Sequence, residues 1–184
     1  MEREIAAIER ELRLVGRHAT MGTDHFPPGD RLERSAHLLL SRIEIDGPLS
    51  IGQLADAFGL DTSTVNRQTA AVLRADLAER IPDPDGGMAR KIRITKEGLR
   101  RLHANRVWAV NGLGTVLADW TADEIATLAH ALLRYNTTIE AMEGRPWPRP
   151  GDALAPPEGP APPEDLCAPE LHGAPELHEE ERGR

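Results

Sequence analysis

Hydrophobic residues recur at helical spacing over most of the first 143 residues of the chain. Near the N-terminus, Glu and Arg fill the positions around one narrow apolar stripe, as in an amphipathic helix that packs on another helix. The stripe consists of Ile5, Ile8, Leu12 and Val15. After the sequence HFPPG, a more apolar helix is expected to begin with a capping-box pattern at Asp30 and Glu33. Its core positions are Leu32, Ala36, Leu39, Leu40 and Ile43.

Two short helices joined by a tight turn are predicted next. Ser50 and Gln53 form a capping box that opens the first helix, which runs through Phe58. Gly59 then breaks the chain, and Asp61 is placed to cap the second helix. The apolar face of this second helix holds Val65, Val72, Leu73 and Leu77. Two helices separated by so short a glycine-containing link form a helix-turn-helix.

The second helix has a buried face and an outward face. Thr69 falls in the middle of the buried face, where we expect its hydroxyl to bond the carbonyl one turn back. The outward arc carries small hydroxyls, amides and arginine, the composition with which a helix approaches a DNA major groove. It comprises Ser63, Thr64, Arg67, Ala71 and Arg74, with Asn66 and Gln68 at its margins. For this helix taken alone, an ordinary solvated face is the alternative.

A basic β-hairpin is expected to follow. Residues 79–82 and 90–94 read as strands on either side of the turn-rich sequence DPDGG. Arg90, Lys91 and Arg93 make the returning strand basic. A helix-turn-helix followed by such a hairpin is a winged helix, and the wing can contact the DNA backbone or a narrow minor groove. The alternative for Arg90 and Lys91 is that they are solvated strand charges.

Two long helices are predicted after Gly98. Apolar positions continue at helical spacing to Trp120, and Thr121 with Glu124 forms another capping box. The last helix carries a nearly unbroken apolar stripe at Ile125, Leu128, Leu132, Tyr135, Ile139 and Met142. Both helices are longer than a small winged helix needs, and pairing with a second subunit is the simplest way to cover the excess apolar surface.

The remaining residues have the composition of a tail. Ten of the 15 prolines lie after Gly144, and the same stretch is acidic, which is typical of a disordered segment. Cys167 and the near-repeat APELHG–APELHE, with His172 and His178, leave a metal site as the less favoured alternative.

The charge distribution changes the first impression of an acidic protein. A net charge of −8 argues against a nucleic-acid binder, because neutralised phosphates supply most non-specific affinity. Residues from 144 onward carry −5 of this charge, however, and the preceding part carries −3. Residues 86–106 alone carry +6, where the hairpin returns and the next helix begins.

Several classes of protein are excluded by what the sequence lacks. The single cysteine rules out an intramolecular disulfide framework, and no long apolar run or signal-like N-terminus is present, so a cytoplasmic protein without membrane contact is expected. The sequence has no phosphate loop, nucleophile elbow or histidine pair at ligand spacing in its folded part. We therefore expect no enzyme, no cofactor and no metal.

Five spaced motifs resemble the MarR family of bacterial winged-helix regulators: L-S-I-x-x-L-A, L-D-x-S-T-V-x-R, L-A-E-R, a D-P turn and I-T-K-E-G. The resemblance runs from about Leu32 to Gly98. It implies a homodimer that binds double-stranded DNA at a pseudo-palindromic operator as a transcriptional regulator, foremost a repressor, with release by a small-molecule effector in many members. The implied fold is mainly α with a small β-hairpin wing.

The expected domain organisation follows from this resemblance. A MarR-like domain spans 1–143, with a winged helix-turn-helix at 30–98 and dimerisation helices at 1–22 and 99–143, and a Pro-rich acidic tail spans 144–184. Where many relatives have Asp-Arg-Arg in the wing, this chain has Gly86-Gly87-Met88. A winged helix retained as a protein-interaction module is therefore the alternative function.

The sequence also predicts which residues meet DNA and a ligand. The expected DNA-binding residues are Ser50, Thr62, Ser63, Thr64, Asn66, Arg67, Gln68, Arg74, Arg90 and Lys91. The family's ligand pockets lie between dimerisation helices and winged helix, which makes His18, His37 and Trp108 candidate lining residues, with ordinary packing or surface positions as the alternative for each.

Overall fold

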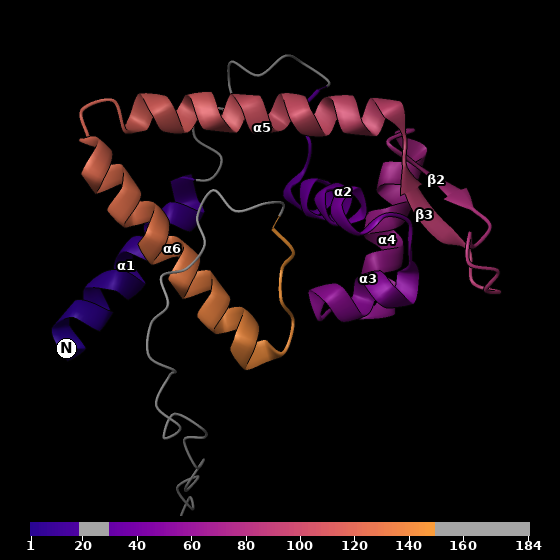
Figure 1. The fold of residues 1–184 in the computed structure, drawn as a ribbon, viewed down its shortest axis with the longest axis horizontal. Coiled ribbons are helices and arrows are strands. Elements are labelled where there is room, and N and C mark those ends of the chain that lie inside the picture. Colours follow the sequence, from indigo (N-terminus) through magenta and orange to yellow (C-terminus); the bar gives the residue numbers. More distant parts are fainter. Residues whose placement is uncertain (19–29, 150–184) are drawn as a thin grey trace, which may run out of the picture.

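The computed structural model describes residues 1–18 and 30–149, apart from the side chain of His18. Helices dominate, and a small antiparallel sheet lies beside the helix-turn-helix (Figure 1). The elements are α1 (Glu2–His18), α2 (Arg34–Asp46), β1 (Leu49–Ser50), α3 (Ile51–Phe58), α4 (Thr62–Arg74), β2 (Ala78–Ile81), β3 (Lys91–Ile94), α5 (Lys96–Val116) and α6 (Ala122–Glu143). The predicted fold class, mainly α with a hairpin wing, is confirmed.

The sheet has one strand more than the sequence predicts. Its order is β1-β3-β2, and both neighbours of β3 are antiparallel to it. Leu49 pairs with Ile92, so the short β1 joins the hairpin to the start of α3. Two residues are too few for an alternating pattern, which is why β1 gives no signal in the sequence.

One hydrophobic core holds the winged helix together. It lies between α2, α3, α4, the sheet and the first turns of α5. Its largest fully buried side chains are Leu39, Leu40, Ile43, Leu54, Val65, Thr69, Val72, Ile92 and Leu102. The capping boxes at Ser50 and Thr121 form as predicted, with Gln53 and Glu124 as their partners.

Three local predictions about helix ends are wrong. The capping box at Asp30 does not form, because α2 begins only at Arg34; Glu33 is its N-cap and makes no side-chain capping bond. Asp30 accepts a bond from Arg100 instead, with 2.7 Å between Oδ1 and Nη2. Leu77 is buried but follows the end of α4, since the chain leaves the helix through Asp76 at a positive φ of 56°. Trp120 likewise lies beyond the end of α5.

Thr69 corrects a further expectation. Its side chain is 0% exposed, and among the described residues its hydroxyl oxygen has no hydrogen-bond partner. The bond to the carbonyl one turn back, expected from the sequence, is absent from this part of the chain. A buried hydroxyl without a partner costs free energy, so α4 contains a destabilising group in the centre of its packed face.

The first half of α5 is tied firmly to the winged helix. The side-chain amide of Asn105 donates to the carbonyl of Asp30 at 2.8 Å and accepts from the backbone N–H of Leu32 at 3.1 Å. Glu44 of α2 accepts from Arg106 at 2.5 Å and contacts Nε2 of His103 at 2.8 Å. These bonds attach the first half of α5 to α2 and to the residues just before it.

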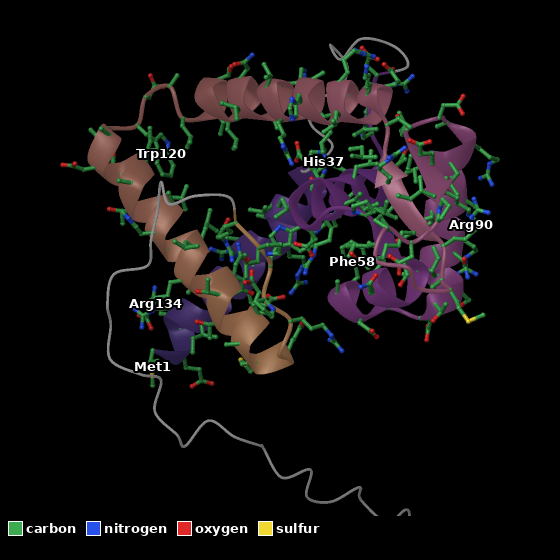
Figure 2. All side chains as sticks on the ribbon, turned by 45° about the vertical axis from the view of Figure 1, so that its right-hand side comes forward. Met1, His37, Phe58, Arg90, Trp120 and Arg134 are labelled. Atoms are coloured by element: carbon green, nitrogen blue, oxygen red, sulfur yellow. The ribbon has the colours of Figure 1, made fainter. Side chains whose placement is uncertain are left out.

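Beyond this anchored part, the helices form an arm whose apolar side chains are uncovered. In Figures 1 and 2, α6 descends from the far end of α5 and α1 lies beside it. None of the described residues of α1 and α6 is buried. No helix in the described part of the chain is long and apolar enough to span a membrane.

The unpaired hydroxyl of Thr69 gives a stability prediction. Thr69→Val keeps the shape of the side chain and removes the buried oxygen, so it should raise the free energy of unfolding by about 1 kcal/mol. Urea denaturation followed by circular dichroism measures the change. Thr115→Val is the matched control, because the Thr115 hydroxyl is exposed and already donates to the carbonyl of Asn111. A Thr69→Val protein that is less stable than wild type would show that the hydroxyl is satisfied.

Candidate nucleic-acid interface

The N-terminal half of α4 presents a polar, exposed surface. Thr62, Ser63, Asn66 and Arg67 are exposed and Thr64 is half-buried. Asp61 is the N-cap residue, as predicted, but its side chain makes no capping bond in the described structure. The exposed helix N-terminus therefore keeps backbone N–H groups that can face an anion.

Arg67 is held along this surface. Its Nη2 donates to the hydroxyl of Thr64 at 3.2 Å. The bond restrains a long side chain while leaving most guanidinium donors available, and Arg with small neighbours can pair bidentately with a guanine edge. These five residues of α4 therefore form one continuous face, which we call the recognition face.

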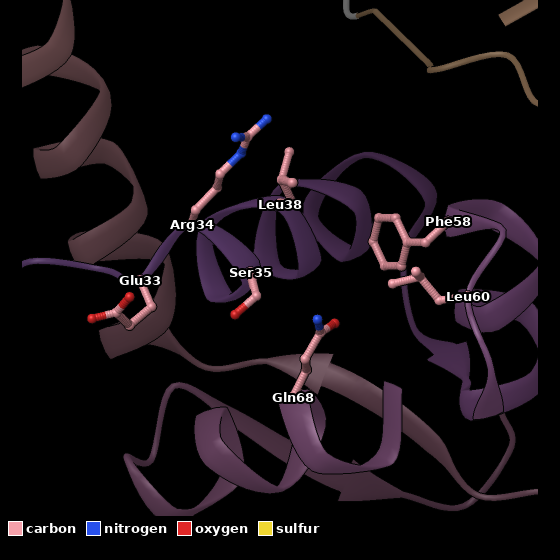
Figure 3. Close-up of a pocket in the computed structure, with 7 residues that line it drawn as sticks. All are labelled: Glu33, Arg34, Ser35, Leu38, Phe58, Leu60 and Gln68. Atoms are coloured by element: carbon pink, nitrogen blue, oxygen red, sulfur yellow. The ribbon is translucent and has the colours of Figure 1, made fainter. Parts of the chain in front are cut away.

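Two predicted residues of α4 lie apart from the recognition face. Gln68 is half-buried and points into a cavity on the other side of the helix (Figure 3). Arg74 is exposed in the last turn, at the opposite end of the helix from Ser63. DNA contacts of these two residues stay predictions, and their positions favour a role at the edge of an interface.

The Ser50 side chain caps α3 as a hydrogen-bond acceptor and keeps its capacity to donate. Its oxygen accepts from the N–H of Gln53 at 3.2 Å, while its own N–H donates to Oε1 of Gln53 at 2.9 Å. A hydroxyl that accepts a capping bond still has a hydrogen to donate. The half-buried Ser50 is therefore able to donate to a phosphate without loss of the cap.

The wing is closed by a cluster of ionic bonds that the sequence did not predict. The ammonium of Lys91 lies 2.8 Å from Oδ1 of Asp83 and 2.8 Å from Oδ2 of Asp85, and its side chain is only 12% exposed. The bond from Lys91 lowers the pKa of Asp83, and the bonds to Asp83 and Asp85 raise the pKa of Lys91. The stability that the ionised Asp83 adds to the wing is therefore fully present above the ordinary aspartate pKa. It is lost as the pH falls through the lowered pKa of Asp83.

Arg90 has a different environment from Lys91. It is exposed at the outer edge of the wing (Figure 2), and its Nη2 donates to the carbonyl of Arg80 at 3.4 Å. Met88 is also exposed. Among the described residues of the wing, Arg80 and Arg90 are thus the cations that form no ion pair with a carboxylate.

Spatial contacts cancel much of the local positive charge. Of the seven basic residues in 86–106, five form ion pairs, namely Lys91, Arg93, Arg100, Arg101 and Arg106. Their carboxylate partners come mostly from outside this stretch. Glu97 is an exception, and its bonds to Arg100 and Arg101 lower its pKa to about 2.

A cavity opens behind the recognition helix. Its volume is about 460 Å³, and it lies between α2, the end of α3 and α4. The lining residues combine apolar and polar groups (Figure 3): Glu33, Arg34, Ser35, Leu38, Phe58, Leu60 and Gln68. Leu38 and Leu60 are exposed apolar residues that line the cavity together with Phe58, and no pattern in the sequence brings these three residues together.

The ligand-lining residues expected from the sequence lie elsewhere. His37 is half-buried on the same helix as Leu38, and burial lowers its pKa. Neither His37 nor Trp108 lines the cavity, and the His18 side chain lies outside the described residues. In the described residues no cluster of His, Cys, Asp and Glu could hold a metal ion, and the tail residues Cys167, His172 and His178 lie outside them.

Comparisons with known proteins agree with this architecture. The MarR family model matches residues 32–86. The uncharacterized HTH-type transcriptional regulator YxaD of Bacillus subtilis (strain 168) is 33% identical over 132 residues, which cover 72% of this chain and 92% of that protein.

Solved structures share the fold over about three quarters of the chain. A MarR family protein from Bacillus stearothermophilus has a TM-score of 0.62 at 20% identity, over 76% of this chain and 97% of its own. The PcaV transcriptional regulator from Streptomyces coelicolor, in complex with its natural ligand, has a TM-score of 0.54 at 22% identity, over 70% and 91%. The family's members are transcriptional regulators and not enzymes. The chain belongs to the MarR family of DNA-binding winged-helix transcriptional regulators.

Proposed function

We propose that the protein is a homodimeric repressor that occupies a pseudo-palindromic operator and leaves it when a small molecule binds. The observation that carries this proposal is the pairing of an exposed recognition face with an arm of uncovered apolar side chains. We assign the winged helix-turn-helix to 30–98 and the dimerisation helices to 1–22 and 99–143.

The arm supports a homodimer because its apolar stripes need a partner. Ile8 of α1 is 54% exposed, Val110 of α5 is 65% exposed and Leu132 of α6 is 46% exposed. The other large apolar side chains left exposed on these helices and their connection are Ile5, Leu12, Leu14, Val15, Val107, Leu113, Val116, Trp120, Ile125, Leu128, Tyr135 and Met142. A second copy offers complementary stripes at the same positions, as a two-fold interface requires.

The recognition face supports sequence-specific binding to DNA. Thr62, Ser63, Thr64, Asn66 and Arg67 would approach base edges in the major groove, while the Ser50 hydroxyl donates to a phosphate. Two such faces in a dimer would enter successive major grooves about 34 Å apart. Gln68 and Arg74 would lie at the rim of the same contact.

The wing supports backbone contact with less charge than the sequence suggests. Arg90 is exposed and would reach a phosphate or the minor groove. Lys91 is paired with Asp83 and Asp85, so its contact with phosphate would have to displace a carboxylate. The same pairing supports the alternative function, a winged helix that binds another protein, and the salt dependence of DNA binding separates the two.

The cavity supports release by an effector. Its volume of about 460 Å³ suits a small organic molecule, and its walls pair apolar groups with a few polar ones. Gln68 belongs both to this cavity and to the recognition helix. An effector that contacts Gln68 would therefore act directly on the position of α4. The related PcaV regulator was solved in complex with its natural ligand, which supports the search for an effector here.

Removing one arginine from each surface tests DNA binding. Arg67→Ala should cost about 1 to 3 kcal/mol on a duplex that the wild-type protein selects from a random pool, and should relax the base preference. Arg90→Ala should weaken all duplexes alike and flatten the dependence on salt. Fluorescence anisotropy titrations measure both effects, with Arg10→Ala of α1 as the control. Unchanged affinities of both folded variants would refute the assignment.

Opening the ionic cluster of the wing should strengthen non-specific binding. Asp83→Asn with Asp85→Asn removes two negative charges and frees Lys91, so the salt dependence on random duplexes should steepen by about one phosphate contact per subunit. Asp119→Asn with Asp123→Asn changes the net charge equally at the corner of α5 and α6. If both pairs of substitutions give the same salt dependence, Lys91 does not reach DNA.

A charge on the apolar stripe tests the homodimer. Ile8→Glu should raise the dimer dissociation constant more than about tenfold, because burial of an isoleucine contributes about 1.5 to 3 kcal/mol. Analytical ultracentrifugation measures the dissociation constant. Ala6→Glu makes the same kind of change on the opposite side of α1 and should leave the dimer intact. A monomeric wild-type protein would contradict the proposal.

A further inference from the structure

The chain does not leave the fold where α6 ends. Gly144 caps α6, and residues Gly144–Arg149, which we call the strap, turn back toward α2 and α3 (Figure 1). Composition predicts that the tail begins at residue 144, whereas the described chain stays packed on the fold through Arg149. Nothing in the proposed dimer or DNA contacts uses them.

One end of the strap is bound to α6. Both guanidinium nitrogens Nη1 and Nη2 of Arg149 bond the carboxylate of Glu140, at 2.9 Å and 2.5 Å. The backbone N–H of Trp147 donates to the same carboxylate at 3.1 Å. Three bonds to one side chain hold the strap against the last turns of the helix.

The middle of the strap, at Pro146 and Trp147, contacts the winged helix. The indole ring of Trp147 lies 5.9 Å from the ring of Phe58 in α3, and the guanidinium of Arg42 in α2 lies 5.5 Å from the indole centroid. Arg42 also donates to the carbonyl of Pro146 at 3.3 Å, while Asp46 holds its Nε at 2.6 Å. The two rings are tilted by 31°, and such an aromatic pair and a cation over an indole face are attractive contacts with a defined direction.

The strap reaches the turn of the helix-turn-helix as well. The guanidinium of Arg145 packs on Gly59, where a Cβ would lie 2.5 Å from Nη1. Gly59 has a φ of +61° and joins α3 to the recognition helix. The strap therefore contacts the two residues, Phe58 and Gly59, that immediately precede the turn into α4.

These contacts connect the arm to the winged helix at a second place, in addition to the start of α5. The first half of α5 leaves the winged helix through its bonds to Asp30 and Glu44, α6 returns, and the strap joins the end of α6 back to α3. With α5 as its only connection, the winged helix could swing about the first turns of that helix. A second connection at α3 fixes the angle between the arm and the recognition helix.

We propose that the strap sets the distance between the two recognition helices of the dimer and that Trp147 determines which half-site spacing the protein accepts. The inference rests on the proposed homodimer, because only two joined copies have a spacing. Trp147 is a positioning residue, since it lies on α3 and contacts no part of the recognition face. A change of one base pair moves a half-site by about 3.4 Å and rotates it by about 35°. A dimer whose recognition helices are held at a fixed distance therefore discriminates strongly between spacings.

The test measures spacing preference apart from affinity. Full-length wild-type protein selects a duplex from a random pool, and its affinity is then compared with that for the same half-sites set one or two base pairs closer or farther apart. Trp147→Ala should reduce this discrimination by about fivefold or more, the usual scale of coupling between packed elements. Its affinity for a duplex with a single half-site should stay unchanged.

Further variants separate the strap from general stability. Arg149→Ala removes two of the three bonds between the strap and Glu140 and leaves the contacts of Trp147 with α2 and α3. It should therefore lower the discrimination in the same direction, and the double variant should add nothing to the effect of Trp147→Ala. Trp147→Phe should keep most of the discrimination, because Phe preserves an aromatic face for Arg42. Arg134→Ala, on the exposed side of α6 (Figure 2), is the matched control.

Three results would overturn the inference. The first is an unchanged spacing preference in Arg149→Ala, which keeps the question open to measurement even if Trp147→Ala fails to fold. The second is an equal loss of single half-site affinity, which would mean that Trp147 supports the winged helix itself. The third is additive effects of the two substitutions. A monomer in ultracentrifugation would instead refute the homodimer, and so the two failures are distinguishable.

Discussion

The geometry of the molecule depends on the close packing of the first turn of α5 against the chain that leaves α4. A Cβ on the buried Gly98 would lie 2.0 Å from the carbonyl oxygen of Leu77, so only glycine permits this approach. Thr95 strengthens the junction, because its hydroxyl donates to the carbonyl of Asp76 at 2.8 Å and caps α5 through the N–H of Gly98. The first turn of α5 is thus held against the residues that follow the recognition helix, and this junction is where the arm begins.

Ion pairs on the winged helix reduce the positive potential that its basic residues would otherwise produce. The sequence concentrates seven cations in 86–106, yet most of them are held by carboxylates that come from distant parts of the chain, such as Asp30 and Glu44. These pairs join elements, and exposed pairs of this kind contribute little free energy each. The potential available to attract DNA consequently comes from the N-terminus of α4 and from cations that form no ion pair in the described part of the chain, such as Arg67, Arg80 and Arg90.

Local sequence patterns predicted the elements well and the contacts between them poorly. The capping boxes at Ser50 and Thr121, the turn at Gly59 and the hairpin follow from residues close in sequence, and each was predicted. The partners of Lys91 across the wing and of Trp147 across the fold depend on side chains brought together by packing, which no local pattern encodes. The cavity beside Gln68 was missed for the same reason, because its walls come from three helices.

Thr69 has a consequence for the dynamics of the recognition helix. Its unpaired hydroxyl lowers the free energy that holds α4 in the core, while neighbouring α2 is packed through Leu39, Leu40 and Ile43 without such a group. Local opening should therefore be easier at α4 than at α2, and backbone amides on the two helices would exchange with solvent at different rates. A helix that opens more readily than its scaffold can adjust its fit to a groove while the rest of the domain stays closed.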